Sequence, residues 1–349
     1  MTLPPHIIRH TFGVAYRAAE RAPTNRNSPS AVSDTRARRV PTLITLDVHE
    51  HPHLDAVLRA AGEFFAGEGV RVTYFVPSGF LIKRPGLSHI LRELSALGHS
   101  IGCHGLNHTP DEDLRGLSPA AEFALLSKAT RILEDALGRP VTSFRAPVFR
   151  LSKHTLRLLA ELGYQADLSV TPQRLSLLSS TPWCFQWLRA PRAPYRPHRQ
   201  SPYRRGELGL LEIPTSCVLL PFAHATMTGI RSKGMSAMLE FLAWEGRHFK
   251  RVLVLLLHPE SLAGEDFFWR GRKLRWSDFI PRRNGGLSLR YHFGDIPPEE
   301  SRRLSREILA RVRARPDLCE MSVDEYLRSS GLPDPARARP PLARAERDA

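Results

Sequence analysis

The stretch Ile101-Gly102-Cys103-His104-Gly105-Leu106-Asn107-His108 ends a short apolar run with two histidines four residues apart. On one turn of helix, positions i and i+4 share a face, so both imidazoles could converge on a single ion. Imidazole is a common ligand of zinc and related divalent metals, and a catalytic zinc site combines three protein ligands with one open position. Because the chain has 15 histidines, such a pair also arises by chance. Its meaning depends on the groups that the fold brings beside it.

Around this stretch, short β-rich runs alternate with amphipathic helical patterns. Each helix must cross back over the sheet, so the alternation predicts parallel strands, either closed as a barrel or open as a doubly wound sheet. The predicted strands are residues 42–47, 70–76, 100–103, 141–145, 164–169, 210–213, 251–257 and 319–322. The predicted helices are residues 54–67, 87–97, 119–137, 153–162, 235–249 and 299–315.

Composition and cysteine usage are those of an ordinary globular protein. The chain has 349 residues, 42% of them hydrophobic, which is enough to bury a full core. The four cysteines are far apart and form no CxxC pair, which indicates a reducing compartment. Residues 1–20 lack the apolar run of a signal peptide, and the strongest apolar run, 252–257, is too short to span a bilayer. These features predict a cytoplasmic protein.

The formal net charge is +15 at pH 7, and almost all of the basic excess is arginine. Such a bias can reflect coding composition alone. Its functional interpretations are contact with an anionic membrane surface, an anionic substrate carrier or nucleic acid. No helix-turn-helix, zinc-finger spacing or aromatic-glycine RNA motif accompanies the charge, so nucleic acid is the least favoured partner.

Three segments follow from the composition along the chain. Residues 1–40 and 331–349 are rich in Pro, Ser, Ala and Arg without periodicity, and we expect both to be disordered. Residues 41–330 are expected to form one α/β domain, with a basic aromatic insertion at 260–295.

Polar and charged groups follow five of the predicted strands. In either parallel architecture, chemistry gathers at the carboxyl ends of the strands, so these groups are expected to share one rim. They are Asp47, His49 and Glu50 after the first strand, His104 and His108 after the third, Arg145 after the fourth, Asp167 after the fifth and His258 after the run 251–257.

This ordered set resembles the polysaccharide deacetylase family, the carbohydrate esterases with the NodB homology domain. The resemblance covers roughly Thr42–Leu262. The family's metal-binding HxxxH motif matches residues 104–108, and its Arg-x-Pro motif matches Arg145-Ala146-Pro147. Its Asp-x-Ser motif matches Asp167-Leu168-Ser169, and its late Leu-x-His type motif matches Leu257-His258. The resemblance implies a distorted (β/α)7-type barrel of parallel strands, similar to a TIM barrel.

The first motif departs from the family, which usually shows Thr-Phe-Asp-Asp with a base followed by a metal ligand. Here Leu46-Asp47-Val48 keeps the first Asp and lacks the adjacent second one. Some members place the ligand two residues after the base, which selects His49. In an extended segment, residues i and i+2 project to the same side, so Asp47 and His49 could share the site. Glu50 competes as the third ligand if the backbone turns there.

The resemblance implies hydrolysis of an N-acetyl group from an amino-sugar unit of a glycan or glycan precursor. Asp47, oriented by Arg145, would be the base, and His258, kept protonated by Asp167, would donate a proton to the leaving amine. A backbone N–H near Val148 would help to stabilise the oxyanion. The metal, most favourably Zn²⁺, would be held by His49, His104 and His108.

Two further features bear on the substrate. The segments 267–292 and 189–205 are rich in aromatic or proline residues and in arginine, and arginine can grip phosphates bidentately. They predict a lipid-linked or otherwise anionic sugar at the inner face of a membrane, although a basic surface without such a role explains them equally well. Two alternative functions stay open: a non-catalytic carbohydrate-binding relative, and a deformylase or amidase acting on another acylated amine.

Overall fold

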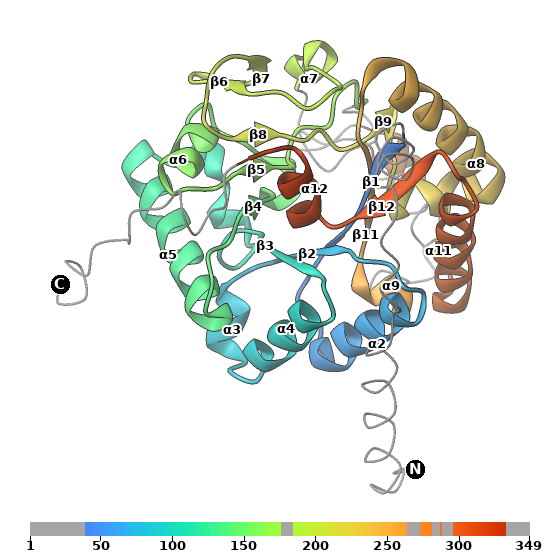
Figure 1. The fold of residues 1–349 in the computed structure, drawn as a ribbon, viewed down its shortest axis with the longest axis horizontal. Helices are drawn as coiled ribbons and strands as arrows, with labels where there is room; N and C mark the ends of the chain where they lie inside the picture. The colour runs from blue at the N-terminus through green and yellow to red at the C-terminus, as the bar shows by residue number, and fades with distance from the viewer. Residues whose placement is uncertain (1–38, 176–183, 264–272, 281–286, 288–295, 333–349) are drawn as a thin grey trace, which may run out of the picture. The chain divides into compact units, whose positions relative to one another are not determined.

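One sheet of eight strands carries the core of the computed structural model, which describes residues 39–175, 184–263, 273–280, 287 and 296–332 (Figure 1). The strand order is β11-β1-β2-β3-β4-β5-β8, and β12 also pairs with β1. All pairings within this sheet are parallel, as predicted. The strands are β1 (Val40–Asp47), β2 (Thr73–Val76), β3 (Ser100–Cys103), β4 (Ser143–Phe144), β5 (Ala166–Asp167), β8 (Leu211–Glu212), β11 (Leu253–Leu257) and β12 (Leu318–Met321).

Helices surround this sheet (Figure 1). They are α2 (Leu54–Gly67), α3 (Gly79–Lys83), α4 (Leu87–Ala96), α5 (Pro119–Leu137), α6 (Thr155–Glu161), α7 (Gln186–Arg189), α8 (His224–Phe249), α9 (Pro259–Ala263), α11 (Pro298–Arg313) and α12 (Val323–Ser329). Their ends follow local sequence signals. The hydroxyl of Ser118 accepts a hydrogen bond from the N–H of Ala121 and caps α5, and Gly138 ends this helix with a φ of 67°.

The two ends of the strand order approach each other through the segment that follows β8. Ala223 forms a parallel bridge with Leu256, and the N–H of Val254 donates a hydrogen bond of 2.9 Å to the hydroxyl of Ser216. This segment therefore lies along β11 and narrows the gap in the sheet. The predicted fold class, a distorted (β/α) barrel, is confirmed.

The interior of the barrel is a distinct apolar cluster. It takes residues from opposite sides of the sheet and from α12, namely Leu43, Phe75, Ala166, Leu168, Ile213, Val252, Val254, Val323 and Leu327. Helix α12 is fixed at the amino-terminal ends of the strands, where the N–H of Val323 donates to the hydroxyl of Thr73 and the hydroxyl of Thr142 donates to Asp324. Since α12 covers this end, the opposite end is the one available for chemistry.

Several elements differ from the sequence predictions. Helix α8 begins at His224 rather than at 235, and its helical conformation is interrupted at Arg231, whose φ is 59°. Helix α12 and two small antiparallel hairpins were not predicted. The hairpins are β6 (Pro197–His198) with β7 (Ser201–Arg205), and β9 (Cys217–Val218) with β10 (Leu220–Pro221).

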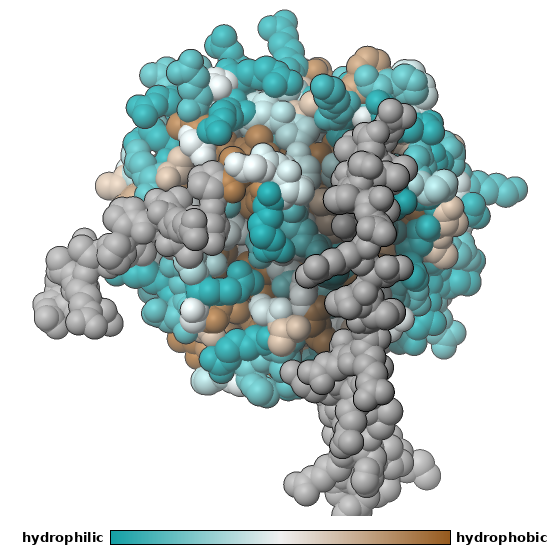
Figure 2. Space-filling model, in the orientation of Figure 1, coloured by the Kyte–Doolittle hydropathy of each residue, from teal (hydrophilic) through white to brown (hydrophobic). Residues whose placement is uncertain are grey.

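Most of the predicted terminal and insertion segments lie outside the described residues. These are 1–38, 333–349, 264–272 and all but one residue of 281–295, so the expected disorder of both termini stays a prediction. Within the described residues, no helix has the length and hydrophobicity needed to cross a membrane. Hydrophilic residues cover much of the face shown in Figure 2, with apolar residues visible between them.

Candidate active site

The carboxylate of Asp47 lies at the end of β1 and is buried. Its Oδ1 accepts a hydrogen bond of 2.7 Å from Nη1 of Arg145, and that guanidinium is fully buried. Arg145 is itself held by the hydroxyl of Thr45 at 2.9 Å and the carbonyl of Leu168 at 3.1 Å. Its guanidinium also lies 4.5 Å from the centre of the Phe75 ring. These contacts fix the base predicted at Asp47 and the orienting arginine as one unit.

Two opposing effects act on the pKa of Asp47. Burial raises it, but the positive charge of Arg145 and the neighbouring His104 and His258 outweigh burial and lower it to about 2. Asp47 is therefore ionised at any pH at which the protein would work. Its Oδ2 lies 3.9 Å from Nε2 of His104 and faces the histidines.

The three predicted metal ligands, His49, His104 and His108, converge at the ends of β1 and β3. Each offers one ring nitrogen, and these nitrogens lie within 4.8 Å of one another. The ring centre of His108 lies 5.0 Å from those of both His49 and His104. Left-handed backbone at Gly105 (φ 77°) and His108 (φ 59°) turns the chain after β3, so that the second histidine of the motif folds back toward the first.

Hydrogen bonds orient this turn and its rings. Nδ1 of His104 lies 2.8 Å from the carbonyl oxygen of Arg145, so its Nε2 is the nitrogen directed into the site. The carboxylate of Glu112 accepts hydrogen bonds from the N–H groups of Asn107 (2.7 Å) and His108 (3.1 Å). Burial lowers the pKa of His104 to about 3 and also lowers that of His108. Both rings are therefore neutral, which is the form that binds a metal.

The donor set fits a divalent ion of the zinc type, because three imidazole ligands are the number that a catalytic zinc site uses, with its fourth position left to water or substrate. His49, and not Glu50, lies together with His104 and His108. The carboxylate of Glu50 is 3.3 Å from the ammonium of Lys83, and its side chain is 58% exposed. Asp47 and His49, two residues apart, lie close enough for the Asp47 charge to act on the His49 ring.

A carboxylate that sequence reasoning missed, Glu260, contacts His49. Its Oε1 lies 3.3 Å from Nδ1 of His49, and its side chain is 5% exposed. Burial would lower the pKa of His49, but the hydrogen bond and charge of Glu260 raise it above its usual value. An ion bound by His49 would displace a proton from this ring. The available signal was its position two residues after His258, at the start of α9.

His258 follows β11, and its ring centre lies 4.8 Å from that of His49 and 6.1 Å from that of His224. Burial, and then the charge of His49, lower the pKa of His258 to about 4. The expectation that Asp167 keeps this imidazole protonated is therefore corrected. His258 is neutral near pH 7, because the carboxylates near it, Glu260 and Asp47, do not compensate for its burial.

Asp167 has a different partner from the predicted one. Its Oδ1 accepts from the hydroxyl of Ser169 at 2.7 Å and its Oδ2 from the N–H of the same residue at 3.0 Å. The Ser169 hydroxyl in turn accepts from the N–H of Ala146 at 2.8 Å. Among the described residues no contact joins Asp167 to His258. The Asp167-Leu168-Ser169 motif instead holds the backbone and side chain of the Arg145 loop.

Glu212, on β8, completes this support and was also missed. Its side chain is fully buried, and its Oε1 accepts from the N–H of Val170 at 3.0 Å. Burial and the neighbouring charge of Asp167 raise the pKa of Glu212 well above its usual value. Glu212 stands opposite Asp167 on the paired strands β5 and β8, so the two carboxyl groups act directly on each other's pKa. A single carboxyl group inside the apolar run 210–213 was the signal that could have found it.

The predicted oxyanion donor lies in the short turn Pro147–Phe149, next to Arg145. Val148 and Phe149 both have left-handed backbone, with φ of 55° and 59°. Non-glycine residues rarely adopt this conformation, and two in succession indicate a strained backbone that the surrounding structure holds in place. The use of the Val148 N–H stays a prediction.

Comparison with known proteins confirms the predicted resemblance. Residues 40–166 match the family model described as polysaccharide deacetylase. A peptidoglycan deacetylase-like protein of Gibberella zeae is 29% identical over 105 residues, which is 30% of this chain and 29% of the length of that relative. The segment matched by the family model, residues 40–166, contains Asp47, the three histidines and Arg145, and it ends just before Asp167.

Two solved structures share the fold. A candidate polysaccharide deacetylase from Mycobacterium smegmatis superposes with a TM-score of 0.53 at 20% identity, over 92% of this chain and 99% of that one. An allantoinase superposes with a TM-score of 0.51 at 14% identity, over 90% and 95%. At these identities the likeness bears on the fold alone.

Proposed function

We propose that this chain is a metal-dependent hydrolase that removes an N-acetyl group from an amino-sugar unit of a glycan or glycan precursor. The observation that carries the proposal is the convergence of His49, His104 and His108 on one point beside an ionised carboxylate, Asp47, held by Arg145. The family match over the segment that contains these residues supports the reaction class.

The three imidazoles would hold the ion, with zinc favoured by the all-nitrogen donor set. When bound, such an ion lowers the pKa of a coordinated water to about 7 and polarises a carbonyl oxygen. His104 and His108 would bind without losing a proton, since burial already keeps them neutral.

Asp47 acts in the proposal as the general base that takes a proton from the attacking water. Its low pKa keeps it ionised, and Arg145 holds one carboxylate oxygen so that the other faces the histidines. The protein does not have to reorganise at the moment of reaction, because the fully buried guanidinium is fixed by Thr45 and Leu168.

His258 acts as the proton donor to the departing amine. Water adds its hydroxyl to the acyl carbon, the C–N bond breaks, and the nitrogen takes up a proton. Because His258 is neutral at rest, it must first receive the proton that Asp47 has taken from water. The acid and base roles are thus two stages of one proton transfer.

For the substrate, we propose a phosphate-linked or otherwise anionic sugar. Within the described part of the basic aromatic insertion, Trp276 is 89% exposed and Phe279 46% exposed, next to Arg275. Flat exposed rings suit a sugar face, and arginine suits a phosphate. The four cysteines are far apart in the sequence and form no CxxC pair, which supports a reducing compartment on the inner side of the membrane.

The test is acetate release from N-acetylated oligosaccharides and from a lipid-diphosphate N-acetyl amino sugar, before and after the protein is stripped of metal and reloaded with zinc. We expect release that requires zinc and a lower KM for the phosphate-linked sugar. Glycan binding without acetate release would make the chain a carbohydrate-binding relative. Release of formate or another acyl group in place of acetate would make it a different amidase.

A further inference from the structure

Glu260 is a buried carboxylate whose partner is a residue of the three-histidine cluster. It lies on α9, and His49 lies two residues beyond β1, so the contact joins two elements far apart in the sequence. Among the described residues, no lysine or arginine lies within ion-pair distance of Glu260. Its negative charge is therefore directed to the His49 ring, with the ring of His258 also near.

The contact determines which nitrogen of His49 faces the cluster. The Glu260 carboxylate lies 3.3 Å from Nδ1 and can only accept a hydrogen bond, so Nδ1 is the nitrogen that carries the proton. The Nε2 lone pair is then the one available to an ion. His104 is held in the same manner, with its Nδ1 against the carbonyl oxygen of Arg145 at 2.8 Å, so two of the three imidazoles present Nε2 for a structural reason.

We infer that Glu260 is a positioning residue for the metal ion: it fixes the tautomer and orientation of His49 and places a negative charge directly behind this ligand. The inference rests on the proposed function in one respect, the binding of an ion by the three histidines. Carboxylates that hold a ligating histidine also raise its basicity, and their loss typically costs 10–100-fold in metal affinity.

The chain offers a matched control in Glu50. Glu50 directly follows His49 in the sequence and carries the same charge as Glu260, but its side chain is exposed and faces Lys83. The variants Glu260→Gln and Glu50→Gln each remove one negative charge. Only the first removes a charge that touches a ligand, so the pair separates direct positioning from a general electrostatic effect.

The experiment measures the zinc dissociation constant of each metal-free protein by competition with a chromophoric chelator. We expect Glu260→Gln to bind zinc about 10–100-fold more weakly than wild type and Glu50→Gln to bind within about twofold, since an exposed charge is screened by solvent and salt. A second readout is the ¹⁵N spectrum of the zinc-loaded imidazoles. In wild type, His49 should carry its proton on Nδ1, and Glu260→Gln should broaden or shift this signal.

Equal zinc affinity of wild type and Glu260→Gln, with an unchanged His49 signal, would overturn the inference and leave the proposed function standing. If wild type binds zinc tightly but releases no acetate, the proposed function fails and the inference is still tested by the affinities. If wild type binds no zinc, both fail. Should Glu260→Gln not fold, Glu260→Asp replaces it: this variant keeps the charge but withdraws it by one methylene, and zinc affinity equal to that of wild type would again overturn the inference.

Discussion

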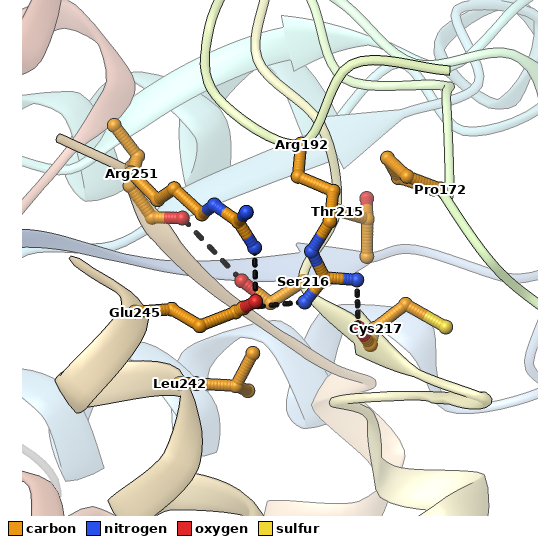
Figure 3. A pocket seen from close by; sticks show the side chains of 9 residues that line it. Pro172, Arg192, Thr215, Ser216, Cys217, Leu242, Glu245 and Arg251 are labelled. Atoms are coloured by element: carbon orange, nitrogen blue, oxygen red, sulfur yellow. Dashed lines mark hydrogen bonds and ion pairs between the residues drawn. The ribbon is translucent and has the colours of Figure 1, made fainter. Parts of the chain in front are cut away.

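Two buried carboxylates, Asp47 and Glu245, are each held by arginine, and their surroundings differ. One carboxylate oxygen of Glu245, on α8, accepts a hydrogen bond from Arg192, and the other accepts one from Arg251 (Figure 3). Arg192 also donates to the carbonyl of Cys217 at 2.7 Å. The adjoining cavity has room for about one water, 10 Å³. Both oxygens of Glu245 are occupied, and the cluster links the loop at 192, α8 and the start of β11.

Asp47 has only one oxygen held by a guanidinium, and the other lies 3.9 Å from His104 and faces the histidine cluster. A carboxylate whose two oxygens are both paired is a cross-link. A carboxylate with one oxygen turned toward neutral imidazoles is available for chemistry. Loss of Asp47 should therefore remove activity and loss of Glu245 should remove stability.

The largest expected effect is that of Asp47→Asn on turnover. The amide keeps the shape of the side chain but cannot accept a proton, so kcat should fall by about 10²–10⁴-fold, the usual contribution of a general base. Zinc content should stay at the wild-type level, because the three histidines are unchanged. Acetate-release kinetics and metal analysis of the same samples check this. Wild-type turnover in Asp47→Asn would remove the distinction between the two carboxylates.

Glu245→Ala should have its main effect on stability. Removal of the buried carboxylate leaves the half-buried guanidinium groups of Arg192 and Arg251 side by side without a counter-charge, which costs at most about 3–5 kcal/mol, the value for a fully buried pair. Denaturant unfolding measures this, and activity per folded molecule should be unchanged. Glu240→Ala is the control, since the side chain of Glu240 is 68% exposed and its pairing with Arg315 is near solvent. Equal stability of the two variants would contradict the assignment of Glu245 as a cross-link.

A smaller effect is expected from Asp167→Asn. Asp167 acts on the Arg145 loop through Ser169 and does not contact the reacting groups. The variant should lower kcat by about tenfold, the lower end for groups that hold a working residue, and it should leave the pH dependence of kcat unchanged, because Asp167 does not contact His258. If Asp167→Asn shifted the pH profile as strongly as His258→Ala, the sequence prediction of an Asp167–His258 pair would be restored.

The last of these effects concerns the pH dependence of folding. Burial lowers the pKa of His99 from 6.5 to about 4. Between these values the unfolded chain binds a proton that the folded chain does not, so stability falls as the pH decreases, by about 1.4 kcal/mol per pH unit for each such histidine. In His99→Asn the amide oxygen can still accept from the N–H of Val72, as Nδ1 does now. Between pH 6.5 and 4, the unfolding free energy of this variant should therefore depend less steeply on pH than that of wild type, because one proton fewer is taken up on unfolding. An unchanged slope would show that His99 is not buried in its neutral form.

Local sequence was sufficient for the parts of the site that lie directly after a strand. Asp47 ends β1, and His104 and Arg145 directly follow β3 and β4, because the apolar runs end there; parallel pairing of these strands brings their ends together. His49 was favoured over Glu50 because some members of the resembled family place this ligand two residues after the base, and the two-residue period of extended chain allows both side chains to lie on one side.

The remaining parts depend on contacts that no local pattern encodes. Glu260 meets His49 across 211 positions of sequence, and this pairing exists because β11 lies beside β1. Asp167 pairs with Glu212 because β8 lies beside β5. Both neighbours are set by the order of strands in the sheet. The same holds for α12, whose apolar residues Val323 and Leu327 became predictable as core only once the end of the barrel that they cover was known.

Bound zinc and zinc-dependent acetate release can be determined together for wild type, His108→Ala and Asp47→Asn. We expect one zinc per chain and zinc-dependent release in wild type, loss of both in His108→Ala, and loss of release with zinc retained in Asp47→Asn. Acetate release that is independent of zinc, or zinc binding in His108→Ala equal to that of wild type, would contradict this expectation.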